Sequence, residues 1–134
     1  MTPEERNSFL NANRFCVVAY NRKDGPPAVT PVYYVVDGDD ILISTQANRA
    51  KGRVLARNQE VTVCVLTEGE PMPRYLTLYG HATIETKGAV GLMMRVGEKM
   101  TGAPVPESAR PALEARAKNE QRVVLRITPV GYLA

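Results

Sequence analysis

A cluster of positive charges between residues 44 and 58 is the segment of this sequence best suited to chemistry. The segment follows an apolar, strand-like stretch and contains no acidic residue. Its four cations are Arg49, Lys51, Arg53 and Arg57. On a helix the three arginines would lie at i, i+4 and i+8, where like charges cost about 0.2–0.5 kcal/mol per pair. Because a helix N-terminus also offers free N–H groups and a positive dipole end, the segment predicts a binding site for an anion such as a phosphate.

Lys51 strengthens this prediction because of where a helix would place it. At about 100° per residue its side chain lies between Ala47, Val54 and Leu55, on the side that should face the core. An ammonium group there needs an anionic partner or a route to water. Two interpretations follow: Lys51 binds the anion, or it extends to solvent from a surface helix whose arginines form an ordinary solvated face.

A second set of candidate residues alternates with apolar residues between positions 75 and 81. The set contains Tyr75, Tyr79 and the single histidine, His81. This strand face has two interpretations, a half-exposed surface that packs against another subunit or an aromatic platform beside a planar ligand. The two coincide where a pocket forms between subunits. A histidine in mid-strand beside tyrosines is more typical of a hydrogen-bonded surface or interface residue than of a catalytic one.

Common nucleotide and metal motifs are missing from the sequence. It has no Gly-x-Gly-x-x-Gly and no Walker loop, which argues against Rossmann and P-loop sites. One histidine and two distant cysteines do not give the spacing of a metal site. Cys16 and Cys64 lie in apolar strand patterns, and we expect both to be free, buried thiols. The methionines at 93, 94 and 100 are more typical of core or interface packing than of a substrate site.

Length and charge narrow the class of protein. The 134 residues suffice for a single domain, 1–134, with a substantial core. No apolar stretch is long enough to span a membrane, and residues 1–6 lack the apolar core of a signal peptide, so we expect a cytoplasmic protein. The formal charge of +3 suits an anionic ligand but is too diffuse to indicate nucleic acid.

Hydrophobic periodicity predicts six strands separated by turns or short helices. A helix capped by Thr2 should run to about residue 13 and bury Phe9 and Leu10. Further helices are expected at about 48–57, at about 87–100, and from near Pro111 to about 119. The strands are expected at about 14–21, 28–36, 41–45, 60–67, 74–85 and 121–128, with a tail over 129–134. Strands joined mainly by hairpins indicate a mainly β fold, a six-stranded antiparallel barrel with short flanking helices.

Several of these segments together resemble one known family. They are the N-terminal helix, Thr30 to Tyr34, Ile43-Ser44 onward to Asn58, Tyr79 to Ala82, and Arg122 to Ile127. The chain resembles the flavin-binding split-barrel proteins of the pyridoxamine 5'-phosphate oxidase type over nearly its full length. It is most similar to small actinobacterial reductases that use the deazaflavin coenzyme F-420. The most specific part of the match is Arg49-Ala50-Lys51.

The resemblance implies a six-stranded split β-barrel that forms a homodimer, with the cofactor in a groove between the subunits. Carried over to this sequence, Ser44, Arg49 and Lys51 hold the phosphate end of the cofactor. Thr30, Pro31 and Val32 run along its ring system by backbone contact. The complete set of predicted cofactor-binding residues is Thr30, Pro31, Val32, Ser44, Thr45, Arg49, Ala50, Lys51, Arg53 and Tyr79.

The function that the resemblance implies is hydride transfer between reduced F-420 and a small organic acceptor. Such an enzyme needs few acid–base residues because the cofactor carries the chemistry. The acceptor pocket would be built from residues 87–120 and the partner chain. An FMN-dependent oxidoreductase or FMN-binding protein is an alternative on the same fold, although four cations without an acid favour the more anionic F-420.

A second alternative is a non-enzymatic barrel that binds single-stranded nucleic acid through its basic helix and its tyrosine strand. The aromatic residues are few, and no basic residues alternate with them along the strand, which disfavours this function. We therefore expect the partners to be a small-molecule substrate and a second copy of the chain, with no nucleic acid and no membrane.

Overall fold

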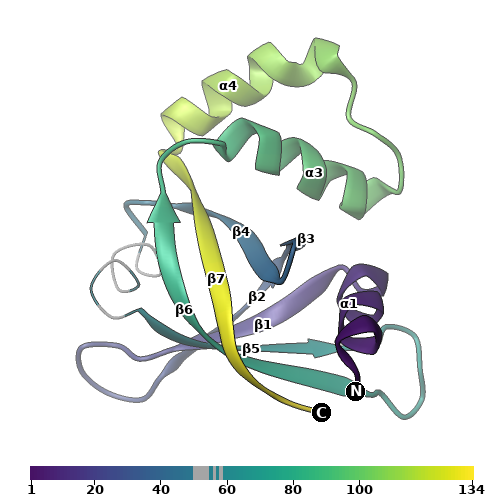
Figure 1. Ribbon diagram of the computed structural model, residues 1–134. Coiled ribbons are helices and arrows are strands. Elements are labelled where there is room, and N and C mark those ends of the chain that lie inside the picture. The colour runs from purple at the N-terminus through teal and green to yellow at the C-terminus, as the bar shows by residue number, and fades with distance from the viewer. Residues whose placement is uncertain (50–54, 56, 58) are drawn as a thin grey trace.

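One antiparallel sheet of seven strands curls around its own apolar face in the computed structural model, which describes residues 1–49, 55, 57 and 59–134 (Figure 1). The strand order is β2-β1-β5-β6-β7-β4-β3. The strands are β1 Phe15–Tyr20, β2 Ala28–Tyr33, β3 Val35–Asp37, β4 Asp40–Gln46, β5 Glu60–Leu66, β6 Tyr75–Glu85 and β7 Arg122–Leu133. The mainly β, antiparallel fold class is confirmed, and β5 is a central strand, as its two apolar faces predicted.

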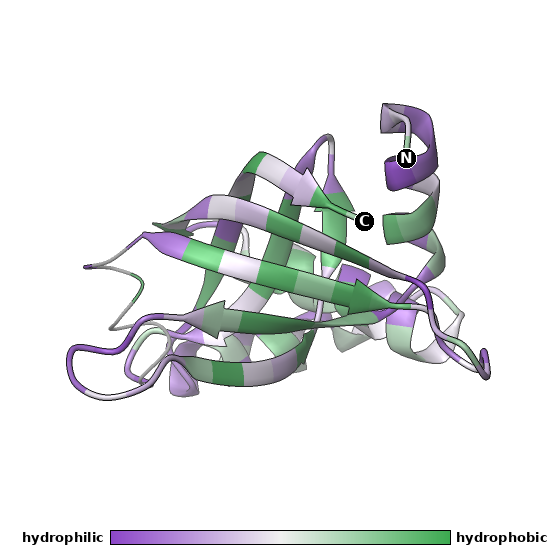
Figure 2. Cartoon of the chain, turned by 90° about the horizontal axis from the view of Figure 1, so that it is seen from below, coloured by the Kyte–Doolittle hydropathy of each residue, from purple (hydrophilic) through white to green (hydrophobic). Residues whose placement is uncertain are grey.

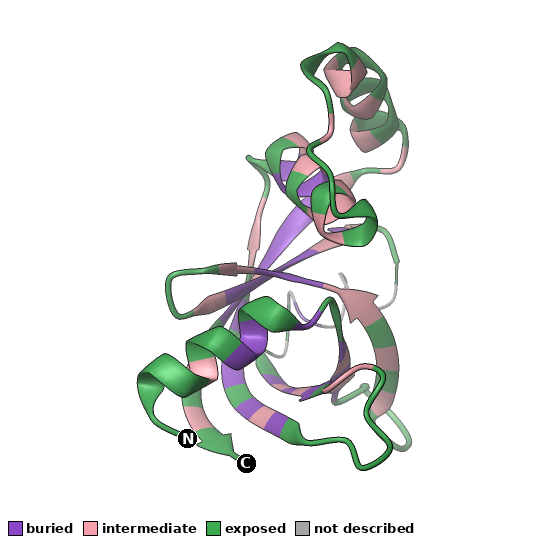
Figure 3. Cartoon of the chain, turned by 90° about the vertical axis from the view of Figure 1, so that its right-hand side faces the viewer, coloured by how far each residue is buried: buried purple, intermediate pink, exposed green. Residues whose placement is uncertain are grey.

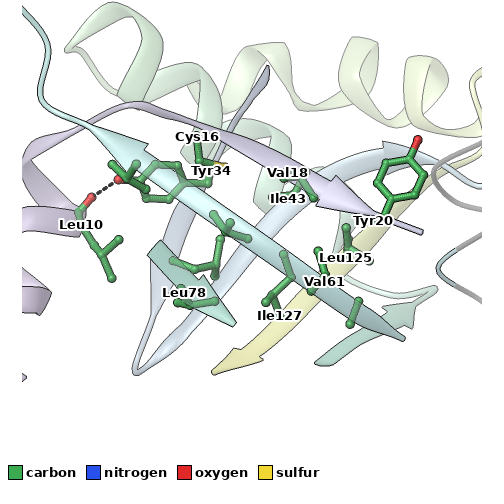
Figure 4. Packing of buried hydrophobic residues seen from close by; sticks show 14 of the residues in the cluster. Leu10, Cys16, Val18, Tyr20, Tyr34, Ile43, Val61, Leu78, Leu125 and Ile127 are labelled. Carbon is green, nitrogen blue, oxygen red and sulfur yellow. Dashed lines mark hydrogen bonds between the residues drawn. The ribbon is translucent and has the colours of Figure 1, made fainter. Parts of the chain in front are cut away.

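The seventh strand arises because the predicted strand over residues 28–36 divides at Tyr34. Up to Tyr33 this stretch pairs with β1, and from Val35 it pairs with β4. The Tyr34 side chain is fully buried, and its hydroxyl donates a 2.5 Å hydrogen bond to the Leu10 carbonyl oxygen (Figure 4). Burying this large ring interrupts the strand and lets the two halves of the stretch join opposite ends of the sheet.

The predicted tail over residues 129–134 is wrong, because β7 continues to Leu133. After a register irregularity at Tyr79/Gly80, the end of β7 pairs with the first half of β6. A bulge of this kind accommodates a proline in a paired strand, which is where Pro129 lies. Gly80 is required at the same place, since a Cβ there would lie 2.7 Å from the Thr128 carbonyl oxygen.

The core fills the inside of the curled sheet. Leu76, Leu78, Gly80 and Ala82 of β6 are buried, as the alternation predicted, and Ile84 is half-buried against them. Apolar and polar bands alternate along the strands in Figure 2, so one side of each strand faces this core. Cys16 and Cys64 remain thiols; Cys16 is buried, whereas Cys64 is only half-buried because it lies on the outer side of β5.

Helix α1, Pro3–Ala12, lies beside one end of the barrel (Figure 3). Thr2 is its N-cap, and the Thr2 hydroxyl accepts a 3.1 Å hydrogen bond from the Glu5 N–H. Phe9 and Leu10 are its buried residues. The predicted capped helix is confirmed in its start, its cap and its buried face.

Two further helices lie between β6 and β7 in the sequence; the first packs on β3 and β4, and the second packs on the first and on β7 (Figure 1). Helix α3 spans Ala89–Thr101, and a short 3-10 turn, Glu107–Ala109, leads into α4, Arg110–Asn119. Leu92 of α3 packs with Leu42, Val35 and Val124 in a small second core.

Two side chains of α3 also donate to backbone carbonyls in β3 and just before it. Lys99 Nζ donates to the Tyr34 carbonyl oxygen at 3.0 Å, and Arg95 Nη2 donates to the Val36 carbonyl oxygen at 2.6 Å. The helix thereby satisfies edge-strand acceptors that would otherwise be open to a further strand.

Most of the predicted basic helix over 48–57 lies outside the described residues, including Ala50, Lys51 and Arg53. Leu55 and Arg57 are described, and both are helical. Leu55 is 1% exposed and joins the main core, whereas Arg57 is exposed. That contrast is the one expected of an amphipathic helix.

Candidate functional site

The candidate site lies at the split in the barrel, where β2 and β4 approach one another with open edges. β2 pairs only with β1 among the described residues. β4 pairs with β3 only as far as Leu42, so its second half, residues 43–46, pairs with β7 alone in the described part of the chain. Backbone groups on these two edges are therefore available to a ligand.

The hydrogen-bonding pattern of β2 shows which residues face the split. The Tyr34 N–H donates to the Arg14 carbonyl oxygen, which places the even-numbered residues in the hydrogen-bonded pairs with β1. Val29, Pro31 and Tyr33 then turn their backbone groups away from β1. Pro31 fits this pattern, because its missing N–H falls on the open side of an edge strand. The Pro31 carbonyl and the Tyr33 amide are thus the polar backbone groups of the split.

Two side-chain hydroxyls at the split are buried without any described hydrogen-bond partner, Thr30 Oγ1 and Ser44 Oγ. A buried hydroxyl without a partner costs about 1–3 kcal/mol, so such groups are rare and point to a missing ligand or water. Both residues were predicted from the sequence to bind a cofactor. The predicted backbone role of Thr30 is less suited to the structure than a role for its hydroxyl, because its backbone faces β1.

The remaining predicted residue on β4 points the other way. Thr45 is 5% exposed and lies on the core-facing side of the strand, between Ser44 and Gln46, whose side chains face outward. Ser44 and Thr45 cannot therefore contact a ligand through the same face of β4.

A groove of about 390 Å³ opens at the split and continues between α3 and α4. Val32, Tyr33 and Ser44 line its barrel side, and Arg122 lines it from β7. The helical side is mostly apolar and comes from the segment expected to form an acceptor pocket. Its lining residues are Met93, Val96, Gly97, Met100, Val105, Ala109, Leu113 and Arg116.

The groove has a basic end. Arg122 is opposite Gln46 in the β4–β7 register, and Gln46 Oε1 accepts a 3.0 Å hydrogen bond from Arg49 Nε. Glu120 bridges two cations, accepting from Arg116 Nε at 2.9 Å and from Arg122 Nη2 at 3.1 Å. The hydrogen bond from Arg116, with a further contribution from Arg122, holds the pKa of the Glu120 carboxyl below its usual range. The two arginines and one ionised glutamate leave a surplus positive charge there.

The structure brings together part of the predicted site. Val32 and Ser44 line one groove, Thr30 lies on the same side of β2 as Val32, and Arg49 follows β4 directly. Ala50, Lys51 and Arg53 lie outside the described residues. Tyr79 lies on the outer face of β6, in a different groove of about 390 Å³ that His81 and Tyr20 also line.

Sequence reasoning missed Arg116, Glu120 and Arg122 as a site. Cations are common in the last turn of a helix because they interact favourably with the helix dipole. Arg116 has such a position in α4, so its place in the sequence did not indicate a binding site. Arg122 reaches the groove only because β7 lies beside β4, a pairing between residues far apart in the sequence.

No group of three or more histidine, cysteine, aspartate or glutamate residues in the described part of the chain could hold a metal ion. None of the described helices is long and apolar enough to cross a membrane.

The sequence pattern that defines the Pyridoxamine 5'-phosphate oxidase family matches residues 2–133. The chain belongs to this family. The match covers almost all of the chain and confirms the resemblance on which the predicted site rests. No curated protein has a sequence that matches this member of the family.

Several solved structures have a fold similar to that of this chain. A conserved hypothetical protein of Mycobacterium tuberculosis is 25% identical, with a TM-score of 0.84 over 98% of this chain and 82% of that chain. A structure titled F420 reductase is 23% identical, with a TM-score of 0.75 over 95% and 94%. An FAD-binding protein of Mesorhizobium loti is 21% identical, with a TM-score of 0.65 over 98% and 90%. This pyridoxamine 5'-phosphate oxidase family member therefore has the split-barrel fold of proteins described as flavin-binding or as an F420 reductase.

Proposed function

We propose that this protein is an oxidoreductase that transfers a hydride between reduced coenzyme F-420 and a small organic acceptor. The observation that carries the proposal is the pair of buried hydroxyls without described partners, Thr30 Oγ1 and Ser44 Oγ. Ser44 lines the basic groove, and Thr30 belongs to the open-edged strand β2, whose Val32 and Tyr33 also line it. Family membership and the similarity to a structure titled F420 reductase support the same class of function.

The residues at the split suit a planar cofactor with a polar edge and a phosphate. The Thr30 and Ser44 hydroxyls, the Pro31 carbonyl and the Tyr33 amide offer both donors and acceptors to a polar ring edge. Arg49, with Lys51 and Arg53 of the following segment, would hold the phosphate. When bound, the cofactor supplies the hydride chemistry. The apolar helical wall of the groove excludes water and positions the acceptor.

Electrostatics favour F-420 over FMN. Both cofactors carry a phosphate, but F-420 adds an oligoglutamate tail with several more negative charges. The described structure adds Arg122, which lies opposite the Gln46 that accepts from Arg49, to the cations of the 49–57 segment. A longer anionic ligand would contact more of these cations than FMN could.

Salt dependence separates the two cofactors. The Debye length falls from about 10 Å at 0.1 M salt to about 3 Å at 1 M, so attraction to exposed cations weakens. We expect the apo-protein to bind F-420 more tightly than FMN, and its F-420 affinity to fall more steeply with salt, in fluorescence titrations. Equal salt slopes, or tighter FMN binding at low salt, would instead support an FMN protein on the same site.

Lys51 provides a direct test of the phosphate site. Lys51→Ala should weaken cofactor binding by about 1.5–3 kcal/mol, the scale of a charge-assisted hydrogen bond. Lys23→Ala is the matched control, because Lys23 is an exposed lysine in the turn between β1 and β2. Unchanged affinity in Lys51→Ala would place the phosphate elsewhere.

The proposal includes a homodimer with the cofactor groove between subunits. The outer faces of the neighbouring strands β1, β5, β6 and β7 carry exposed apolar side chains, and Leu66 lies opposite Tyr75 in the β5–β6 register. They include Phe15, Leu66, Tyr75, Tyr79 and Leu133, each 41–51% exposed. Apolar surface of this kind, continuous over several strands, is typical of a protein interface.

Light scattering tests the dimer directly. The monomer mass is 14.7 kDa, and at micromolar concentration we expect twice that value. Tyr79→Lys should shift the population toward monomer by placing a charge within the apolar face. A monomer mass for the unmodified protein would contradict this part of the proposal.

A further inference from the structure

The groove between α3 and α4 combines an apolar wall with a cation at one end. Met93, Val96 and Met100 of α3 lie at i, i+3 and i+7, so they share one helix face. Ala109 and Leu113 line the opposite side and lead along α4 toward Arg116. The cation and the apolar residues therefore belong to one continuous surface.

The guanidinium group of Arg116 has hydrogen-bond donors that no described residue uses. Its Nε is the atom that contacts Glu120, and within the described structure its two terminal NH2 groups have no hydrogen-bond partner. Arg122 uses Nε and Nη2 on the same carboxylate, and its side chain is only 18% exposed, against 58% for Arg116. Arg122 lies beside Gln46 and the strand edge, whereas Arg116 faces the groove from α4.

We propose that this groove binds an apolar organic anion as the acceptor, with its carboxylate or equivalent group on Arg116 and its apolar body between α3 and α4. The assignment to an acceptor rests on the proposed function. Charge complementarity selects the anion, because Glu120 neutralises only one of the two arginines it contacts. The apolar wall selects the rest of the molecule, since polar groups there would find few partners.

The test uses two probes of the same shape, 2-naphthoate and 2-naphthalenemethanol, titrated calorimetrically into the full chain. We expect naphthoate to bind about threefold to fivefold more tightly, the range of a partly exposed charge pair. Arg116→Met should abolish this preference while leaving the affinity for the alcohol unchanged. Arg110→Met is the matched control, because Arg110 lies on the same helix, pairs with Glu107 and does not line the groove.

A second variant tests the apolar wall. Leu113 is half-buried, so Leu113→Ser should fold and should weaken both probes by about tenfold through lost apolar contact. Equal affinity of the two probes for the unmodified protein, a naphthoate preference that survives in Arg116→Met, or probe binding unaffected by Leu113→Ser would each overturn the inference.

Cofactor titrations of the same variants separate this inference from the proposed function. Normal F-420 or FMN binding without any naphthoate preference would overturn the acceptor class alone. Failure of both cofactors to bind would overturn the proposed function, and with it the assignment of the groove to an acceptor.

Discussion

Removing one buried hydroxyl should make this protein more stable and a poorer cofactor binder at the same time. The perturbation is Thr30→Val, which keeps the branched shape of the side chain and replaces Oγ1 with a methyl group. Thr30 Oγ1 is buried at the barrel split and has no hydrogen-bond partner in the described structure. Substitution therefore removes a desolvated polar atom without breaking any described interaction.

The magnitude follows from the cost of that atom. A buried hydroxyl without a partner costs about 1–3 kcal/mol, and valine also suits an edge strand at least as well as threonine. We expect the apo-protein to gain about 1–2 kcal/mol in the free energy of unfolding. At about 2.1 cal/mol/K of unfolding entropy per residue, 1 kcal/mol corresponds to roughly 3–4 °C in Tm for a chain of this length.

Thr67→Val is the matched control with the opposite expected sign. Thr67 Oγ1 donates to Glu70 Oε2 at 2.9 Å and accepts from the Arg74 N–H at 2.9 Å. The same substitution there loses two hydrogen bonds, and it should lower the free energy of unfolding by about 1–2 kcal/mol. The contrast between the two variants isolates the effect of the missing partner from that of the side-chain change.

The assay combines thermal unfolding of the apo-protein with fluorescence titration of the cofactor. Thr30→Val should raise Tm and weaken cofactor affinity by about threefold to tenfold, the value of one neutral hydrogen bond. Ser44→Ala should behave in the same way. A lower Tm for Thr30→Val would show that its hydroxyl is already satisfied, and unchanged cofactor affinity would remove Thr30 from the site.

Two further predictions concern the packing of α3 on the sheet and the pairing of β6 with β7. Burial lowers the pKa of Lys99 to about 8, so above pH 8 the folded state binds fewer protons at this amine than the unfolded state does, and urea unfolding should show stability rising from pH 8 to about 9.5. Lys99→Met should flatten this rise. Burial raises the pKa of Tyr34, which has the opposite effect and should end the rise near the ordinary phenol pKa of about 10. A stability that falls over that range would contradict the burial of the Lys99 amine. Gly80→Ala should destabilise the protein by about 3 kcal/mol or more, because its Cβ would lie 2.7 Å from the backbone oxygen of Thr128. Gly91→Ala, with no atom within 4 Å of the new Cβ, should instead be neutral or stabilising in the same unfolding assay, and equal losses in both would refute the steric reasoning.

The sequence by itself determined the local elements and the class of ligand. Alternation along residues 75–85 identified a strand and its buried face, and Thr2 with the following Pro3 identified the start of α1. These features depend on side-chain period and on capping chemistry within a few residues, so they can be read without tertiary structure. The basic segment, combined with the family resemblance, similarly indicated an anionic cofactor.

Tertiary structure alone decided where strands end and which residues meet. Tyr34 divides a continuous apolar stretch because its ring is buried and its hydroxyl reaches α1, and β7 runs past Pro129 because β6 pairs with it. Arg122 and Ser44 line the same groove only because β4 and β7 are neighbours, although about 80 residues separate them in sequence. Local propensity carries no record of such long-range pairing, which depends on closing the barrel around one shared core.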